Sequence, residues 1–118
     1  MDDSRPIFLQ LAERIVDDII SGTLPEESQV PSTNEFAAFH RINPATAGKA
    51  VNVLVENGTL YKKRGIGMFV APGARARLIG ERATQFHADY IEPLLDEAAK
   101  LGIDNEQLIT MIRRDNAT

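Results

Sequence analysis

The sequence predicts a mainly α-helical fold with one small β-hairpin, an α+β class in which the hairpin follows three helices. Two helix-start signals, at Ser32 and at Asn43-Pro44, and a glycine-turned pair of short strands between Leu60 and Val70 lead to this prediction. Two capped helices followed at once by a hairpin have the order of a winged helix-turn-helix. Two further helices are expected after it.

The first helix is expected directly after Pro6. Apolar residues recur at helical spacing along one face of it: Ile7, Leu11, Ile15, Ile19 and Ile20. We interpret this face as core that packs against the next two helices, because it offers no polar group to a ligand.

The next two helices have capping signatures. Ser32 can cap a helix whose third residue, Glu35, reaches back to the amide of the cap. After a short connection, Asn43 can cap another helix that has Pro44 in its first turn and ends near Asn57-Gly58. The buried stripe of this helix is predicted to comprise Ala47, Ala50, Val51 and Leu54.

The hairpin is expected from two short strands, residues 60–63 and 68–70, joined through Arg64-Gly65-Ile66-Gly67. The glycines permit positive φ and close backbone approach at the turn. Lys62, Lys63 and Arg64 therefore lie at or beside the hairpin tip.

Composition limits the classes of protein to which the chain can belong. With 118 residues it can form one domain, or a small domain plus an appendage that needs a partner. It has no Cys and only two His, so we expect no disulfide, no metal and no other cofactor. No apolar run approaches the roughly 20 residues that span a bilayer, and we expect no membrane contact and a cytoplasmic protein.

Positive charge is concentrated around the third helix and the hairpin. Residues 40–64 contain five bases and one acid, Glu56, whereas the whole chain has a net charge of −4. A basic run alone is often only a solvated surface. Beside a helix with a polar outer face, it favours a double-stranded DNA-binding surface over that interpretation.

At this point the chain resembles the DNA-binding domain of the GntR family of bacterial transcription regulators, over roughly the first 70 residues. The resemblance rests on several short stretches taken together: Pro6 to Gln10, Ile20-Ser21-Gly22, Pro31-Ser32, Ala37, Asn43-Pro44-Ala45-Thr46, Leu54, Asn57-Gly58, and Gly65 to Val70. The short C-terminal part is similar to that of the YtrA subfamily. Asn34 departs from the family, which usually has an arginine there.

We assign DNA contacts to four places in the chain. The third helix would enter the major groove with its N-terminal turn, which projects amides and short polar side chains, and Lys49 is the best candidate for reading bases. The start of the second helix and Arg5 would contact phosphates, and the hairpin would contact the backbone or the minor groove. The candidates are Arg5, Ser32, Thr33, Asn34, Asn43, Ala45, Thr46, Lys49, Lys62, Lys63, Arg64, Gly65 and Gly67. Ser32 also has the simpler interpretation of a helix cap.

The segment after Pro72 is predicted to form a long amphipathic helix, kinked near Pro93, and a final helix that Asp104 and Gln107 cap. We therefore divide the chain into residues 1–72, the DNA-binding domain, and residues 73–118, a dimerisation region. The apolar face of the C-terminal helices has little to pack against within one subunit, which predicts a homodimer. The proposed dimerisation residues are Ile79, Ala83, Phe86, Tyr90, Leu94, Ala98, Leu101, Leu108, Ile109 and Ile112.

The predicted function is a repressor that binds a pseudo-palindromic operator as a homodimer, with a small-molecule effector acting around residues 72–95 as a further hypothesis. An enzyme is disfavoured, because the carboxylate pairs Asp17-Asp18 and Asp96-Glu97 are adjacent on a helix and point apart. His87 is interpreted as structural. The alternative is a winged-helix protein-interaction module without specific DNA binding, because the fold alone does not determine function.

Overall fold

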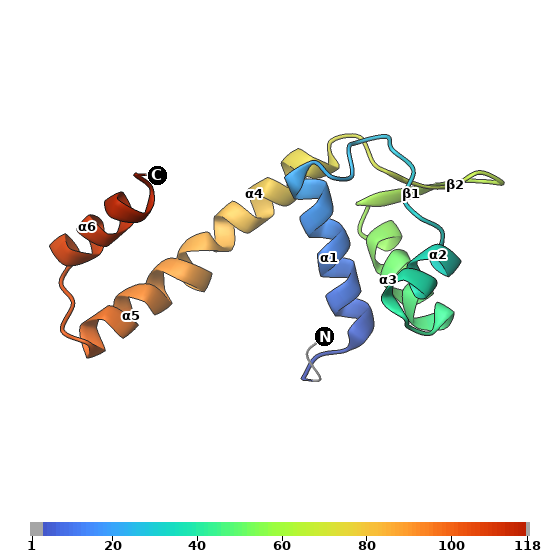
Figure 1. Ribbon diagram of the computed structural model, residues 1–118. Helices are drawn as coiled ribbons and strands as arrows, with labels where there is room; N and C mark the ends of the chain where they lie inside the picture. The colour runs from blue at the N-terminus through green and yellow to red at the C-terminus, as the bar shows by residue number, and fades with distance from the viewer. Residues whose placement is uncertain (1–3, 118) are drawn as a thin grey trace. The chain divides into compact units, whose positions relative to one another are not determined.

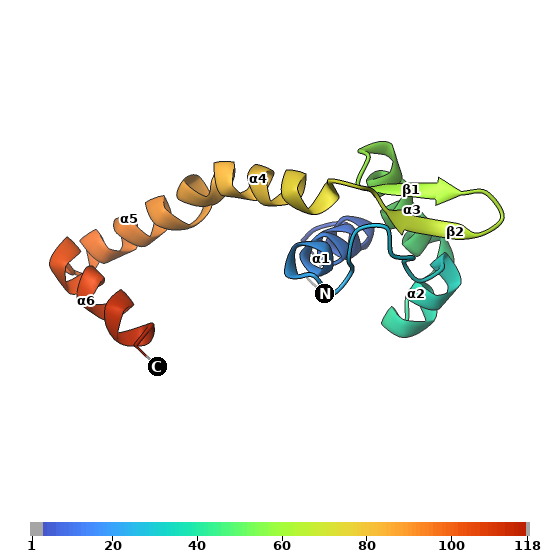
Figure 2. The same cartoon turned by 90° about the horizontal axis from the view of Figure 1, so that it is seen from above.

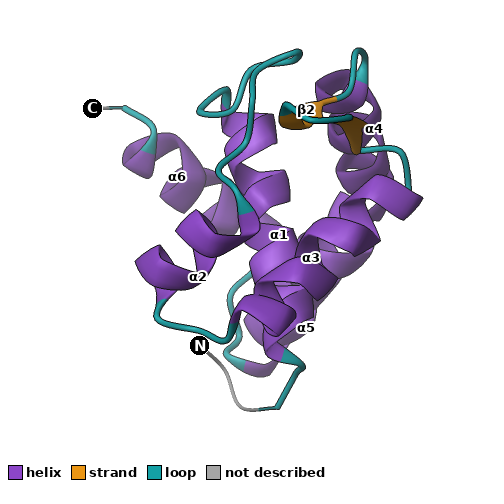
Figure 3. Cartoon of the chain, turned by 90° about the vertical axis from the view of Figure 1, so that its right-hand side faces the viewer, coloured by secondary structure: helices purple, strands orange, loops and turns teal. Residues whose placement is uncertain are grey.

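The structure, a computed structural model, describes residues 4–117 and is mostly helical, with one two-stranded antiparallel sheet (Figures 1 and 3). It divides into two compact units, of which the first ends at Gly80 and the second begins at Glu81. The predicted fold class is confirmed. The elements are α1 (Ile7–Ser21), α2 (Thr33–His40), α3 (Pro44–Glu56), β1 (Leu60–Lys63), β2 (Gly67–Val70), α4 (Ala74–Phe86), the π-helical turn η1 (His87–Ile91), α5 (Glu92–Lys100) and α6 (Asn105–Asp115).

Helix α1 begins after Pro6 and ends at Ser21, and it is followed by Gly22, whose φ of +88° suits a glycine at a helix C-terminus. Its predicted stripe is buried at Leu11, Ile15 and Ile19. Ile7 was also expected in the core and is instead 45% exposed. Because it lies one turn before Leu11, at the first position of the helix, the buried face does not extend to it.

Helices α2 and α3 begin as their capping residues predict. Ser32 and Glu35 form the reciprocal capping box, and Asn43 caps α3 with Pro44 at its first position. Between the two helices, Arg41 takes the left-handed conformation with φ +56°, and its amide bonds to the carbonyl of Ala37. This turn forms the corner of a helix-turn-helix.

Strands β1 and β2 form the hairpin, with Leu60 opposite Val70 and Lys63 opposite Gly67. The turn between them projects beyond the helices of this unit (Figure 2). The segment between α1 and α2 pairs with the other edge of β2: Val70 N donates to Ser28 O at 3.0 Å, and Val30 N donates to Met68 O at 2.9 Å. The sequence did not reveal this third extended segment.

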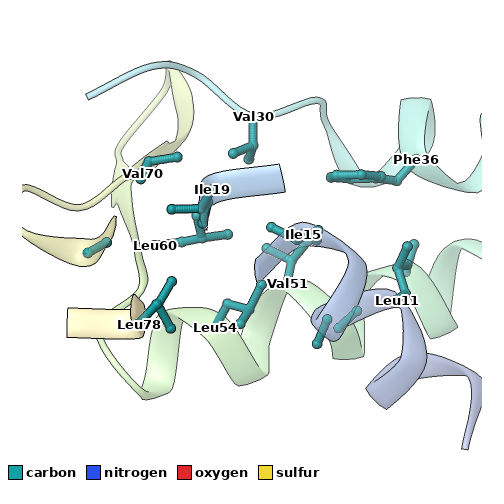
Figure 4. Close-up of a cluster of buried hydrophobic side chains, with 14 of the residues drawn as sticks. Leu11, Ile15, Ile19, Val30, Phe36, Val51, Leu54, Leu60, Val70 and Leu78 are labelled. Carbon is teal, nitrogen blue, oxygen red and sulfur yellow. The ribbon is translucent and has the colours of Figure 1, made fainter. Parts of the chain in front are cut away.

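One hydrophobic core holds the first unit together (Figure 4). It includes Leu11, Ile15 and Ile19 of α1, Phe36 of α2, Val51 and Leu54 of α3, Leu60 and Val70 of the hairpin, and Val30 before α2. Ala74 and Leu78 of α4 belong to the same core.

Two arginines also tie the start of α4 to the first unit. Arg75 Nε donates to Ile20 O at 2.9 Å, at the end of α1, and an Arg77 guanidinium N–H donates to the buried Thr59 Oγ1 at 2.7 Å. The first compact unit therefore extends past Pro72, the boundary predicted from the sequence, to Gly80.

The second unit contains the end of α4, η1, α5 and α6. The irregularity expected near Pro93 occurs as the π-helical turn His87–Ile91, directly before α5. Pro93 has no N–H to donate and its ring crowds the preceding turn, which accounts for this irregularity. Asp104 and Gln107 form the expected capping box on α6. Among residues 4–117, no helix is long and apolar enough to cross a membrane.

Candidate nucleic-acid interface

The N-terminus of α2 presents two backbone donors without internal partners. The Ser32 hydroxyl accepts from the amide of Glu35 at 3.1 Å, and the Glu35 carboxylate accepts from the amide of Ser32 at 3.1 Å. Within the described residues, the amides of Thr33 and Asn34 donate no hydrogen bond. Free amides at the positive end of a helix favour an anion such as a phosphate oxygen. The capping role of Ser32 is thus observed, and the two amides after it are available for an anion.

The N-terminus of α3 differs, because its amides bond within the chain. Asn43 Oδ1 accepts from the amide of Ala45 at 2.7 Å, and Asn43 O accepts from the amides of Thr46 and Ala47 at 3.0 and 3.1 Å. Pro44 has no N–H. The expectation that this end projects free amides is therefore wrong, and side chains are what α3 can offer to a partner.

The outer face of α3 carries Ala45, Lys49 and Asn52, which are exposed on the side opposite the buried Ala47, Ala50, Val51 and Leu54. Thr46 is half-buried at the edge of this face. The Lys49 Nζ lies 5.9 Å from the centre of the Phe8 ring of α1, within the range of a cation–π interaction. Lys49 therefore remains exposed while its ammonium lies over α1.

The start of α2 lies beside α3. A Cβ added at Gly48 would lie 3.8 Å from the Thr33 Cγ2, which is an ordinary van der Waals contact. The free amides of α2 and the exposed face of α3 therefore belong to neighbouring surfaces of one folded unit.

The hairpin tip presents Lys62, Lys63 and Arg64, all exposed. Among the described residues, no carboxylate forms an ion pair with any of the three. The Lys63 Nζ lies 4.4 Å from the centre of the Phe69 ring on the opposite strand. A cation–π contact does not neutralise the ammonium, so the tip stays cationic.

One acid lies near the base of the hairpin. Glu27 accepts a hydrogen bond from the Tyr61 hydroxyl at 2.9 Å and so holds the pKa of this phenol above its ordinary value. Glu27 itself adopts φ +66°, in a turn that lacks a glycine. The bond between the two residues joins this turn to β1.

Two further glycines and one arginine complete the predicted site. Gly65 has φ +79° in the turn that Ile66 N closes by donating to Lys63 O at 2.9 Å. Gly67, the first residue of β2, pairs with Lys63, the last residue of β1. Arg5 forms an ion pair with Glu13, so its charge is partly compensated before any phosphate approaches. It is the predicted contact that the geometry supports least.

Sequence reasoning missed Gln29, whose side-chain Nε2 donates to Ile66 O at 3.1 Å. No local pattern could have found it, because the two residues are far apart in the sequence. The two histidines are not part of a metal cluster, since no group of three or more potential ligands converges among residues 4–117. His87 Nδ1 lies 3.5 Å from Glu92 Oε1.

Most of the predicted dimerisation residues are exposed in the single chain. Phe86, Tyr90 and Leu101 are 54%, 65% and 65% exposed, and the Phe86 and Tyr90 ring centres lie 5.5 Å apart. Ile79, Ala83, Leu94, Ile109 and Ile112 are exposed as well. Ala98 and Leu108 differ, because they are already buried within the subunit. They pack the chain's own helices and have little surface left for a second copy.

Helices α2 and α3 form a helix-turn-helix, and the hairpin that follows them is a cationic wing. With the free amides at the start of α2 and the polar outer face of α3, these elements define a winged helix-turn-helix domain of the DNA-binding class. Residues 8–70 match the family described as bacterial regulatory proteins, gntR family. The chain belongs to the GntR family. Proteins of this family are DNA-binding transcriptional regulators rather than enzymes.

Similarity to individual relatives extends beyond the matched domain. The chain is 25% identical to the HTH-type transcriptional repressor YtrA of Bacillus subtilis over 114 residues, which cover 97% of this chain and 87% of YtrA. A solved GntR family transcriptional regulator from Listeria monocytogenes matches with a TM-score of 0.74 and 29% identity, covering 97% of this chain and 98% of that chain. The second unit is thus shared with relatives of similar length.

A third similarity covers about half of the chain. The DNA-binding domain of AraR, solved in complex with operator ORR3, matches with a TM-score of 0.52 and 33% identity, covering 54% of this chain and 77% of that chain.

Proposed function

We propose that this chain is a transcriptional repressor that occupies a pseudo-palindromic DNA operator as a homodimer. The observation that carries the proposal is the presence, in one folded unit, of the free amides of Thr33 and Asn34, the exposed Lys49 and a cationic hairpin tip that forms no ion pair with the described carboxylates. The name of YtrA as a repressor and the AraR–operator complex support it. We assign DNA binding to the first unit and pairing of subunits to the second.

In this proposal α3 lies in the major groove and reads bases through side chains. Lys49 can donate to guanine O6 or N7, and Thr46 can contact a base edge or a thymine methyl. Asn43 uses its Oδ1 for capping, so its side-chain NH₂ is the group left for DNA. The amides of α2 contact a phosphate and fix the orientation of α3.

The hairpin acts as a wing against the DNA backbone or the minor groove. Its cations add affinity with little sequence information, except where a narrow minor groove has enhanced negative potential. The net charge of −4 opposes nonspecific binding along DNA, so local cations rather than the overall field must supply the attraction.

Pairing of two copies would bury the apolar residues that the second unit leaves exposed. Burial of apolar surface contributes about 25 cal/mol per Å², which favours association over exposure of Phe86, Tyr90 and Leu101. A two-fold dimer presents two α3 helices to half-sites separated by about 34 Å or a multiple of it. An effector acting through residues 72–95 would change this separation, and thereby the affinity.

Binding across a salt series tests the proposal. The full chain would select a duplex from a random-sequence library, and its affinity for that duplex would then be compared with its affinity for a shuffled duplex of equal composition. We expect selective binding, with log affinity falling by about 0.9 per neutralised phosphate per log unit of salt. If no duplex is selected at low salt, with or without a metabolite screen, the protein-interaction alternative replaces this proposal.

A further inference from the structure

We propose that Gln29 is a positioning residue for DNA binding, whose side chain locks the wing tip in the conformation that presents Arg64 and Ile66 to DNA. The inference rests on the proposed function, because it concerns how the wing meets DNA. Gln29 lies outside the hairpin, in the segment between α1 and α2.

Three contacts place Gln29 against the hairpin. Its backbone forms a bridge with Phe69 of β2, on the edge opposite β1. Its side-chain Nε2 donates to Ile66 O at 3.1 Å. The same nitrogen occupies the space in which a side chain at Gly67 would begin, because a Cβ added there would lie 2.6 Å from it.

Gly67 and Gln29 therefore form a matched pair. Gly67 has φ +148°, a conformation that L side chains rarely adopt, and it leaves the space that the Gln29 amide fills. Ile66 is the last residue of the turn. Its carbonyl accepts the hydrogen bond from Gln29, and its amide donates to Lys63 O. Both backbone polar groups of Ile66 are thus fixed.

A lock at this place affects the residues that protrude. Ile66 is 63% exposed at the projecting tip, where its own chain does not cover it, and Arg64 precedes it in the same turn. Apolar side chains flanked by cations suit the minor groove, where apolar wedges contact base steps and cations contact the negative potential. A short two-stranded ribbon without further support is flexible, and ordering it before binding lowers the entropy cost of the contact.

The test compares the full-length variants Gln29→Ala and Gln29→Glu with the wild type on the duplex that the wild type selects. Gln29→Ala removes the donor, and Gln29→Glu keeps the length while placing a carboxylate beside Ile66 O. We expect Gln29→Ala to bind roughly three- to tenfold more weakly, the range for loss of one hydrogen bond, and Gln29→Glu to bind at least as weakly. The salt slope should decrease, because a loosened wing neutralises fewer phosphates.

Two controls separate positioning from stability. Gln85→Ala alters another exposed glutamine, on α4, and should leave affinity and salt slope unchanged. Gln29→Ala should stay folded at the temperature of the binding assay, as thermal unfolding would show, because it loses only one exposed hydrogen bond. An affinity loss that merely follows a loss of folded protein would overturn the inference.

A double-mutant cycle with Gly67→Ala tests the pairing itself. In the wild type a Cβ at Gly67 displaces the Gln29 amide, so Gly67→Ala should weaken binding by a similar factor. Added to Gln29→Ala, it should cost less, because the clash with the amide is gone and only the backbone strain at Gly67 remains. Fully additive losses, or an unchanged salt slope in Gln29→Ala, would contradict the lock. Failure of the wild type to select any duplex would instead count against the proposed function.

Discussion

The unit that ends at Gly80 and the unit that begins at Glu81 bury their apolar side chains to very different degrees. The first has a continuous core contributed by α1, α2, α3, the hairpin and the start of α4. The second buries Ala98 and Leu108 and leaves Phe86, Tyr90 and Leu101 more than half exposed. A core of the first kind supports a fold within one chain, whereas under the proposed pairing the second unit would gain much of its stability from a second copy.

Leu54→Ala should have the largest effect on stability. Leu54 is 2% exposed in the core of the first unit, and truncating a buried leucine costs about 2–5 kcal/mol. Urea unfolding would measure the loss, which should not depend on protein concentration. Leu101→Ala is the matched variant in the second unit and should cost stability only at concentrations where two copies pair. Equal losses from both variants at low concentration would erase the contrast between the units.

Leu94→Lys should separate the subunits and leave the first unit folded. Leu94 is 40% exposed on α5, and a charge there opposes burial against a second copy. Sedimentation velocity should show a dimeric wild type and a monomeric variant, with binding to the selected duplex weakened by about 100-fold through loss of bivalency. Gln85→Lys serves as the control for added charge. A Leu94→Lys protein that remained dimeric would move the pairing surface elsewhere.

Lys49→Ala should weaken selective binding by about 1–3 kcal/mol, the discrimination that one good base contact supplies, and relax the preference at one position of the site. Competition between the selected duplex and single-base variants would measure it. Lys100→Ala is the matched control on α5. Phe8→Leu keeps Lys49 but removes the ring beneath it. If Phe8→Leu reproduced the whole effect, packing rather than base reading would explain the role of Lys49.

Gly48→Ala should have the smallest effect and the opposite sign. Gly48 lies inside α3, and a Cβ there would make an ordinary contact with Thr33 at 3.8 Å. Replacing a helix-interior glycine by alanine should therefore raise the free energy of unfolding by about 0.5–1 kcal/mol. Thermal unfolding would measure the gain. A loss of stability would show that the space between Gly48 of α3 and Thr33 of α2 cannot hold the added methyl group.

Local signals explain what the sequence predicted correctly. The capping boxes at Ser32 and Asp104 and the proline after Asn43 act within a few residues, so they are visible in the sequence. The hairpin could be recognised from its glycines and its run of bases, which are close together in the sequence. The apolar stripe of α1 could be recognised from its helical periodicity, apart from the exposed Ile7.

Contacts between distant segments were not predictable in this way. Gln29 reaches Ile66, Arg75 reaches the end of α1, and Arg77 reaches Thr59 only after the chain has folded. The free amides also could not be assigned from capping signatures alone. The Asn43 side chain accepts from the amide of Ala45, and the Asn43 carbonyl accepts from the next amides of α3. At Ser32, in contrast, the amides of Thr33 and Asn34 have no hydrogen-bond partner within residues 4–117.

The stoichiometry of binding tests the central claim most directly, namely that the first unit reads DNA and the second unit pairs two readers. Sedimentation of the full chain would be followed with the selected duplex and with a duplex in which one half-site is scrambled. The account predicts two chains on the intact duplex, bound cooperatively, and a large loss of affinity when one half-site is scrambled. Binding of a single chain to both duplexes with equal affinity would contradict it.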